Sequence, residues 1–356
     1  MIEEKPYVLP LPRYARLALL LLGLYVFIAM LSIAQAILVP FLFGVIISIV
    51  LHPIVNWLVQ KRISRALAIL ITLAPVILLT GIIMFYITTQ AGLLSSLFPY
   101  MLLKMQQLLH QVLLWVSGLF HANALQINKW TTETEDRLIH STSKAIGQAF
   151  IAIGFMLEET LLACIYVVLL LFYRPLLVAF LYELFKSRTA TMVEVLGETR
   201  SLIQNYLTGL VLEAAIVAAL YAVGLYLIGI EFALLLGIIG AFLNVIPYLG
   251  GLVAVSLMLM VTFITKDTMT YPLLVLALAA LIHFIDNTFI IPYLVASKVQ
   301  VNALVAITVV IAGHALWGIA GMILSIPLTG ILKLFFDRIA ILRPWGLLLG
   351  NQKGQA

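Results

Sequence analysis

Charged residues are scarce in this chain. Asp, Glu, Lys and Arg together make up only 10% of its 356 residues, whereas 64% are hydrophobic. A soluble globular domain has roughly a quarter of its residues charged and about half apolar. The deficit extends along the whole sequence and leaves no long polar domain. The composition therefore excludes a soluble protein and predicts one that spans a membrane many times.

Cysteine and several catalytic motifs are also missing. The single Cys164 excludes an intrachain disulfide, and no apolar segment carries a His and Cys cluster, so we expect no metal site. The sequence has no G-x-x-x-x-G-K-[ST], no H-E-x-x-H and no G-x-S-x-G. We therefore expect no ATP-driven pump of that type, no enzyme and no cofactor.

The net charge of +5 comes without any long basic run, so it does not indicate a nucleic-acid partner. The basic residues lie mostly at the ends of apolar segments, which is typical of cytoplasmic loops. With the N-terminus placed in the cytoplasm, most of them fall on the cytoplasmic side. We expect a multi-pass protein of the cytoplasmic (inner) membrane with both termini in the cytoplasm.

The apolar segments define the predicted fold. A span needs about 20 apolar residues. Unbroken candidates cover 14–32, 37–58, 66–88, 147–173, 203–229 and 270–292. Two pairs of shorter segments follow a different pattern, 232–246 with 252–264 and 302–316 with 319–336. We predict an all-α polytopic membrane protein with about 6–8 full crossings, Gly/Pro-broken or re-entrant helical pairs in the C-terminal half, and an amphipathic extracytoplasmic helix.

The first apolar segment also has the layout of a signal peptide, because Lys5, Arg13 and Arg16 precede it and Ala34-Gln-Ala36 follows it. Apolar sequence continues beyond that point to Trp57. We therefore favour a retained first transmembrane helix.

Polar segments divide the chain into four predicted parts. Residues 1–175 form an N-terminal transmembrane scaffold, and 176–201 alternate apolar with charged residues as a cytoplasmic amphipathic linker helix does. Residues 202–340 form a transport domain with broken helices, and 341–356 form a cytoplasmic tail.

The scaffold includes one sizeable excursion out of the membrane, residues 91–145. Apolar residues there recur at alternating spacings of 4 and 3, which indicates a heptad seam and hence a homo-oligomer. The alternative is an amphipathic helix that lies on the membrane surface or folds back on its own chain. The seam residues are Leu94, Phe98, Met101, Met105, Leu108, Val112 and Trp115.

The breaks within the apolar pairs are the strongest indication of function. Backbone broken at membrane depth is tolerated only where protein or a watery cavity surrounds it, and paired broken segments point to a transporter's binding site. Proline removes an amide donor, and glycine permits close backbone approach. We expect a substrate site formed by Asn244, Pro247, Tyr248, Gly250, Gly251, Asn287, His314 and Trp317.

Ionisable residues within apolar segments are costly and are therefore functional candidates. Asp286 and His283 are three residues apart, on one face of a helix, where they could bind a proton, a cation or a polar solute. Glu213 lies within another span. We expect these three to couple transport to an ion or proton. The alternatives are capping of freed backbone near Pro292 and a structural bond between helices.

The C-terminal half carries a series of short motifs in a characteristic order: Tyr206-Leu-x-Gly209, Gly237, Asn244-x-Ile246-Pro247-Tyr248-Leu-Gly250, Asp286-Asn287-x-x-Ile-x-Pro292 and Trp317-Gly318-Ile-x-Gly321-Met-x-x-x-Ile326-Pro327. In these motifs the chain resembles the AI-2E family of transporters. Two departures are Gly251, where the family usually has proline, and Ser297-Lys298, where Gly-Lys is common. Expected hinge positions are Gly209, Pro292, Gly313, Gly318, Gly321 and Pro327.

The resemblance implies a homo-oligomeric secondary transporter with both termini inside. Some relatives are associated with export of autoinducer-2, a small polyhydroxylated furanone, and others look like sodium or lithium/proton antiporters. We favour export of a small polar organic solute by alternating access. The alternative is a monovalent cation/proton antiporter using Asp286 and Glu213, against which the dispersion of the carboxylates counts. A non-transporting scaffold or passive channel is the third hypothesis.

Overall fold

The computed structural model describes residues 12–96, 160–184, 189–246, 250–296 and 301–350. Every regular element within these ranges is a helix, and seven of the helices are long and apolar enough to cross a membrane. The prediction of an all-α polytopic membrane protein is therefore confirmed. Of the predicted seam, Leu94 lies in the third helix, and the members from Phe98 to Trp115 lie outside the described residues.

The N-terminal half consists of α1 (Arg13–Ile33), α2 (Gln35–Gln60), α3 (Arg65–Ser96) and a helix over Thr160–Leu184. None of the side chains of α1 is buried, as expected for a helix that faces lipid. The other three pack together around a small apolar core, with Leu51, Ile69 and Leu171 at its centre.

Four prolines lie inside these helices, and at two of them, Pro53 and Pro175, polar side chains repair the backbone bond that the proline removes. Pro175 has no amide for the carbonyl of Leu171, and the Arg65 guanidinium donates to that carbonyl through Nε at 3.0 Å and Nη2 at 2.7 Å. Pro53 likewise leaves the carbonyl of Ile49 free, and Gln204 Nε2 donates to it at 2.7 Å. Because lipid offers no hydrogen bonds, such repair permits proline at membrane depth.

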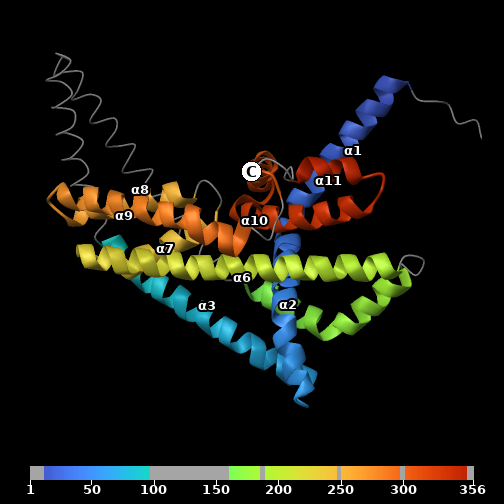
Figure 1. Cartoon of the computed structure of the whole chain (residues 1–356), viewed down its shortest axis with the longest axis horizontal. Helices are drawn as coiled ribbons and strands as arrows, with labels where there is room; N and C mark the ends of the chain where they lie inside the picture. Colours follow the sequence, from blue (N-terminus) through green and yellow to red (C-terminus); the bar gives the residue numbers. More distant parts are fainter. Residues whose placement is uncertain (1–11, 97–159, 185–188, 247–249, 297–300, 351–356) are drawn as a thin grey trace, which may run out of the picture.

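The long helix α6 (Thr189–Ile228) crosses the molecule in Figure 1 and contains no proline. The segment 176–201, which the sequence predicts as one linker helix, is instead divided between two long helices. Residues 176–184 end the Thr160–Leu184 helix, because Arg65 compensates Pro175, and residues 189–201 begin α6. Nothing in the amphipathic pattern of this segment marked these boundaries.

After α6 the chain turns back at Gly229 and Phe232, which have φ values of +82° and +59°. Helices α7 (Ala233–Asn244) and α8 (Gly250–Thr265) then form a hairpin. Gly250 lies against the backbone of Leu243 near the bend, and Gly240 packs on Met258 farther along. This is the first of the predicted broken pairs, and residues 247–249 between its two helices lie outside the described residues.

The next helix, α9 (Thr270–Ile285), changes to a wider winding at its end. The π-helical segments η2 (Asp286–Ile290) and η3 (Pro292–Ala296) follow it, and Ile291 donates its amide to the carbonyl of Asp286, five residues back. Such π segments are rare and frequently occur at functional sites.

Helix α10 (Ala303–Arg338) is a second hairpin. Its backbone leaves helical geometry at Trp317 and at Gly318, where φ is +59° and ψ is −138°. A Cβ on Gly313 would lie 2.5 Å from the carbonyl oxygen of Gly321, although eight residues of straight helix would separate these positions by about 12 Å. The predicted break at 316–319 therefore reverses the chain.

Both ends of the α10 hairpin lie beside the short helix α11 (Arg343–Leu349). The Asn302 amide donates to the carbonyls of Leu348 and Gly350, and Gly350 packs against the Lys333 side chain. Although α10 has the length of a membrane-spanning helix, its first and last turns lie side by side next to α11.

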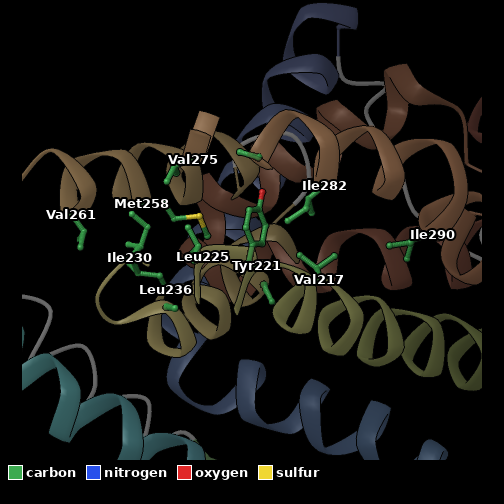
Figure 2. Close-up of a cluster of buried hydrophobic side chains, with 13 residues drawn as sticks. Val217, Tyr221, Leu225, Ile230, Leu236, Met258, Val261, Val275, Ile282 and Ile290 are labelled. Carbon is green, nitrogen blue, oxygen red and sulfur yellow. The ribbon is translucent and has the colours of Figure 1, made fainter. Parts of the chain in front are cut away.

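The main core joins α6 to the first hairpin and to α9. Figure 2 shows Tyr221 of α6 near the centre of this cluster, with its hydroxyl pointing away from its own helix and Met258 of α8 beside it. A smaller cluster joins the two hairpins: Ile246, at the bend of the first, packs on Val310 and Met322 of the second. The two broken pairs are therefore in direct contact.

Candidate substrate and ion site

A cavity of about 690 Å³ lies between α6, the α7–α8 hairpin, the junction of α9 with η2, and α10. Most of its wall is apolar, and the polar side chains gather where α6, α7 and η2 meet. The lining residues are Tyr206, Leu210, Glu213, Asn244, Val245, Ile246, Gly251, Leu252, Val255, Leu276, Ala279, Ala280, His283, Asp286, Asn287, Ile291, Val301, Ala306 and Ile326.

Two buried carboxylates share one amide at this wall. Asn244 Nδ2 donates to Asp286 Oδ2 at 2.9 Å and to Glu213 Oε1 at 3.3 Å. Asp286 is 2% exposed and Glu213 is 5% exposed. The three residues come from three different elements, η2, α6 and α7, and the amide bridge connects them.

No Lys or Arg in the described part of the chain pairs with these two carboxylates, and the basic group that acts on Asp286 is the His283 imidazole. The ion pairs found there involve Lys333 and Arg338, and neither contacts Asp286 or Glu213. The second oxygen of Asp286, Oδ1, is buried and has no hydrogen-bond partner among the residues that the structure describes. An uncompensated buried acceptor of this kind favours a ligand that brings a positive charge, a proton or a hydroxyl donor.

Close backbone packing brings Asn244 to the carboxylates. A Cβ on Gly237 would lie 2.7 Å from the amide nitrogen of Ala222 and 2.8 Å from the carbonyl of Ala218, so only glycine lets α7 approach α6 this closely. A Cβ on Gly250 would lie 1.7 Å from the carbonyl oxygen of Leu243. Gly237 and Gly250 thus fix Asn244, the last residue of α7, opposite Glu213.

His283 and Asn287 complete the polar part of the wall. His283 lies one turn before Asn287, whose side-chain amide donates to the His283 carbonyl at 2.8 Å. A Cβ on Gly251 would lie 3.5 Å from Asn244 Oδ1 and 3.7 Å from the His283 ring, so this glycine leaves open space between the two side chains. The predicted grouping of His283, Asp286 and Asn287 is present in the structure.

Two predicted binding residues lie elsewhere. His314 is exposed on the first arm of α10 and is not part of the cavity lining. Trp317 is buried against the N-terminal half, where its Nε1 donates to the Leu31 carbonyl at 3.0 Å. That carbonyl belongs to the last turn of α1, which leaves its carbonyls without helical partners. The structure therefore assigns Trp317 to attachment of the second hairpin, not to the cavity wall.

The predicted hinge positions fall into different structural settings. Gly313 and Gly321 bring the two arms of α10 into backbone contact, and Gly318 adopts a conformation that other residues avoid. Pro292 begins η3, and Pro327 lies within the second arm of α10. The remaining position, Gly209, lies within the uninterrupted helix α6. Pro247 and Tyr248 lie outside the described residues.

The sequence analysis missed two features of this site. Tyr206 and Leu210 were not proposed as lining, although together with Glu213 they occupy positions i, i+4 and i+7 of one helix face. That spacing was available as a signal. The bridging role of Asn244 had no comparable signal, because residues 213, 244 and 286 are far apart in the chain.

Comparison with known proteins agrees with this architecture. YrrI of Bacillus subtilis (strain 168) is 24% identical over 322 residues, which cover 85% of this chain and 86% of that protein. The AI-2 transport protein TqsA of Escherichia coli (strain K12) is 26% identical over 335 residues, covering 90% of this chain and 92% of TqsA. The model of the AI-2E family transporter matches residues 16–341. The chain belongs to the AI-2E transporter family.

Proposed function

We propose that this chain is a secondary transporter that moves a small polar organic solute through the cavity between α6, the two hairpins and α9. The observation that carries this proposal is the cavity itself, whose volume of about 690 Å³ is far larger than a bare ion needs. Pockets of roughly 300–1,000 Å³, mostly apolar with a few convergent polar groups, suit small organic ligands. The acceptors of Asp286, Glu213 and Asn244 would bind the solute's hydroxyl groups.

A second function, monovalent cation/proton antiport, is favoured by a different observation. Asp286 and Glu213 share one amide and form no ion pair with a Lys or Arg among the described residues, and His283 is the basic side chain that acts on Asp286. The dispersion of carboxylates along the sequence counted against this function, but the fold brings these two together. A cation or proton held between them would neutralise buried negative charge.

We propose in addition that the protein lies in the cytoplasmic membrane with both termini in the cytoplasm, exports its solute by alternating access and assembles as a homo-oligomer. The topology is supported by the two hairpins, α7–α8 and α10, each of which would return to the side of the membrane where it begins. The six other long helices of the described part then cross the membrane, and an even number of crossings places both termini on the same side. Export and oligomerisation are supported only by the resemblance in sequence and by the heptad spacing in 91–145.

Transport by the purified full-length chain in liposomes would test the proposal. Uptake of labelled polar metabolites, including autoinducer-2, is measured in vesicles of both orientations, and an interior pH dye reports proton movement when sodium, lithium or potassium is added. A solute exporter predicts saturable solute movement that is lost in Asp286→Asn and Glu213→Gln. An antiporter predicts a cation-dependent pH change that is lost in the same variants.

The matched control is Glu231→Gln, which removes a carboxylate from the exposed turn after α6, away from the cavity. We expect this variant to transport like the wild type. A wild-type protein that moves neither solute nor protons would contradict both functions and favour a non-transporting scaffold. Equal losses of transport in Asp286→Asn, Glu213→Gln and Glu231→Gln would show that transport depends on negative charge in general and not on the carboxylates of the cavity.

A further inference from the structure

We propose that a basic cluster formed by His52, Arg65, Arg174 and Arg200, none of which lines the cavity, binds the headgroup phosphate of an anionic phospholipid. The four residues come from four helices: α2, α3, the Thr160–Leu184 helix and α6. The contacts that pack these helices bring the basic side chains together.

The first contact joins α3 to the Thr160–Leu184 helix. Arg65 is the first residue of α3, and its guanidinium reaches the Leu171 carbonyl that Pro175 leaves free. Arg174 lies three residues after Leu171, so it lies on the same face of that helix, about one turn farther on. Arg65 and Arg174 are both partly buried.

The second contact joins α6 to α2. Gln204 donates to the carbonyl of Ile49, and Arg200 lies one turn before Gln204 on α6. His52 lies three residues after Ile49 on α2, next to Leu51 of the core that also contains Leu171. The α2–α6 crossing, visible in Figure 1, therefore brings Arg200 to the same region as Arg65 and Arg174.

The cluster concentrates positive charge without a carboxylate partner. The positive charges of Arg65, Arg174 and Arg200 act on the His52 ring, and those of Arg65 and Arg200 act on Arg174. Within the described residues, the ion pairs found involve Lys333 and Arg338 and none of these four. Nδ1 of His52 is buried, and none of the described residues forms a hydrogen bond with it. These like charges repel one another, and an anion among them would offset that repulsion.

The chemistry and the position both point to a lipid phosphate. Arginine guanidinium groups match the geometry of phosphate oxygens. Trp57, five residues after His52 on α2, is 53% exposed, and Tyr173, the residue before Arg174, is 50% exposed. Exposed Trp and Tyr mark the headgroup level of a membrane, and basic pockets between transmembrane helices on the cytoplasmic side bind anionic headgroups.

Native mass spectrometry of the detergent-purified full chain would test this proposal. Phosphatidylglycerol or phosphatidylcholine is titrated, and the Kd of the first bound lipid is measured for each. We expect preferential binding of phosphatidylglycerol. One basic residue near an anionic lipid surface contributes about fivefold in affinity, so Arg174→Gln with Arg200→Gln should weaken binding about 25-fold. Arg174→Lys with Arg200→Lys should retain most of the preference for phosphatidylglycerol.

The matched control is Arg13→Gln with Arg16→Gln, which removes the same charge from exposed positions at the start of α1. It should leave the Kd unchanged, and an equal loss there would reduce the effect to general charge attraction and overturn the site. Complete displacement of phosphatidylglycerol by the same concentration of inorganic phosphate would assign the cluster to free phosphate. A wild-type protein with no preference between the two lipids would also refute the proposal, whatever the variants do.

Discussion

The Asn244 amide is expected to be a main contributor to the stability of the cavity wall. Asn244→Ala removes both hydrogen bonds that connect Asp286 and Glu213, at 2.9 and 3.3 Å, without altering either carboxylate. A hydrogen bond between side chains in a membrane protein contributes about 0.6 kcal/mol on average and about 1.7 kcal/mol at most. The loss of two bonds should therefore lower the free energy of unfolding by about 1–3 kcal/mol.

The matched control is Asn287→Ala, which removes the same amide from the same cavity wall. Its amide donates only to the backbone carbonyl of His283, within its own helical segment, so a single bond is lost and no carboxylate is left unpaired. We expect a cost of about 0.6 kcal/mol for this variant. Both free energies are measured by reversible unfolding of the full-length chain in mixed micelles.

A double-variant cycle separates the bridge from other effects of Asn244→Ala. In a background with Glu213→Gln, one of the two charges that the amide holds is gone, so Asn244→Ala should cost less than in the wild type. If Asn244→Ala costs no more than Asn287→Ala, or costs the same in both backgrounds, the amide does not hold the carboxylates together and the proposed coupling site loses its structural basis.

Two further predictions concern the backbone. Gly250→Ala would place a methyl group 1.7 Å from a carbonyl oxygen of α7 and should greatly reduce the yield of folded protein, whereas Gly251→Ala, with its nearest contact at 3.5 Å, should fold normally. Size-exclusion chromatography in detergent measures the yield of each variant. Equal yields would contradict the packing at the bend. Gln204→Leu should lower the midpoint of thermal unfolding because the Ile49 carbonyl loses its donor. Adding Pro53→Ala should recover most of that loss, because it restores the amide that bonds this carbonyl within the helix. No recovery would show that Gln204 does not stabilise the protein through the Ile49 carbonyl.

The sequence by itself was sufficient for the class of fold. Long apolar segments with few charges require helices, because lipid offers no partners for exposed backbone. The breaks at Asn244–Gly251 and at Trp317–Gly318 were readable because proline and glycine impose local backbone constraints that do not depend on the rest of the chain. The structure places a hairpin bend at each break.

Helix ends were predicted less well, because they depend on partners distant in sequence. Pro175 suggests an interruption, yet the helix continues to Leu184 since Arg65, more than a hundred residues earlier, donates to the freed carbonyl. No local pattern contains that information.

The assembly of the site was decided by the tertiary structure alone. Asp286, His283 and Glu213 were predicted individually from the cost of placing ionisable groups in a membrane. Their meeting at one cavity, and the bridge through Asn244, depend on how α6, α7 and η2 pack, which the glycine contact between α7 and α6 determines. Tertiary packing also places Trp317 in contact with α1, and not in the expected site. The sequence alone identified the ionisable residues whose burial in a membrane costs free energy, and the packing of the helices decided which of them lie together in one site.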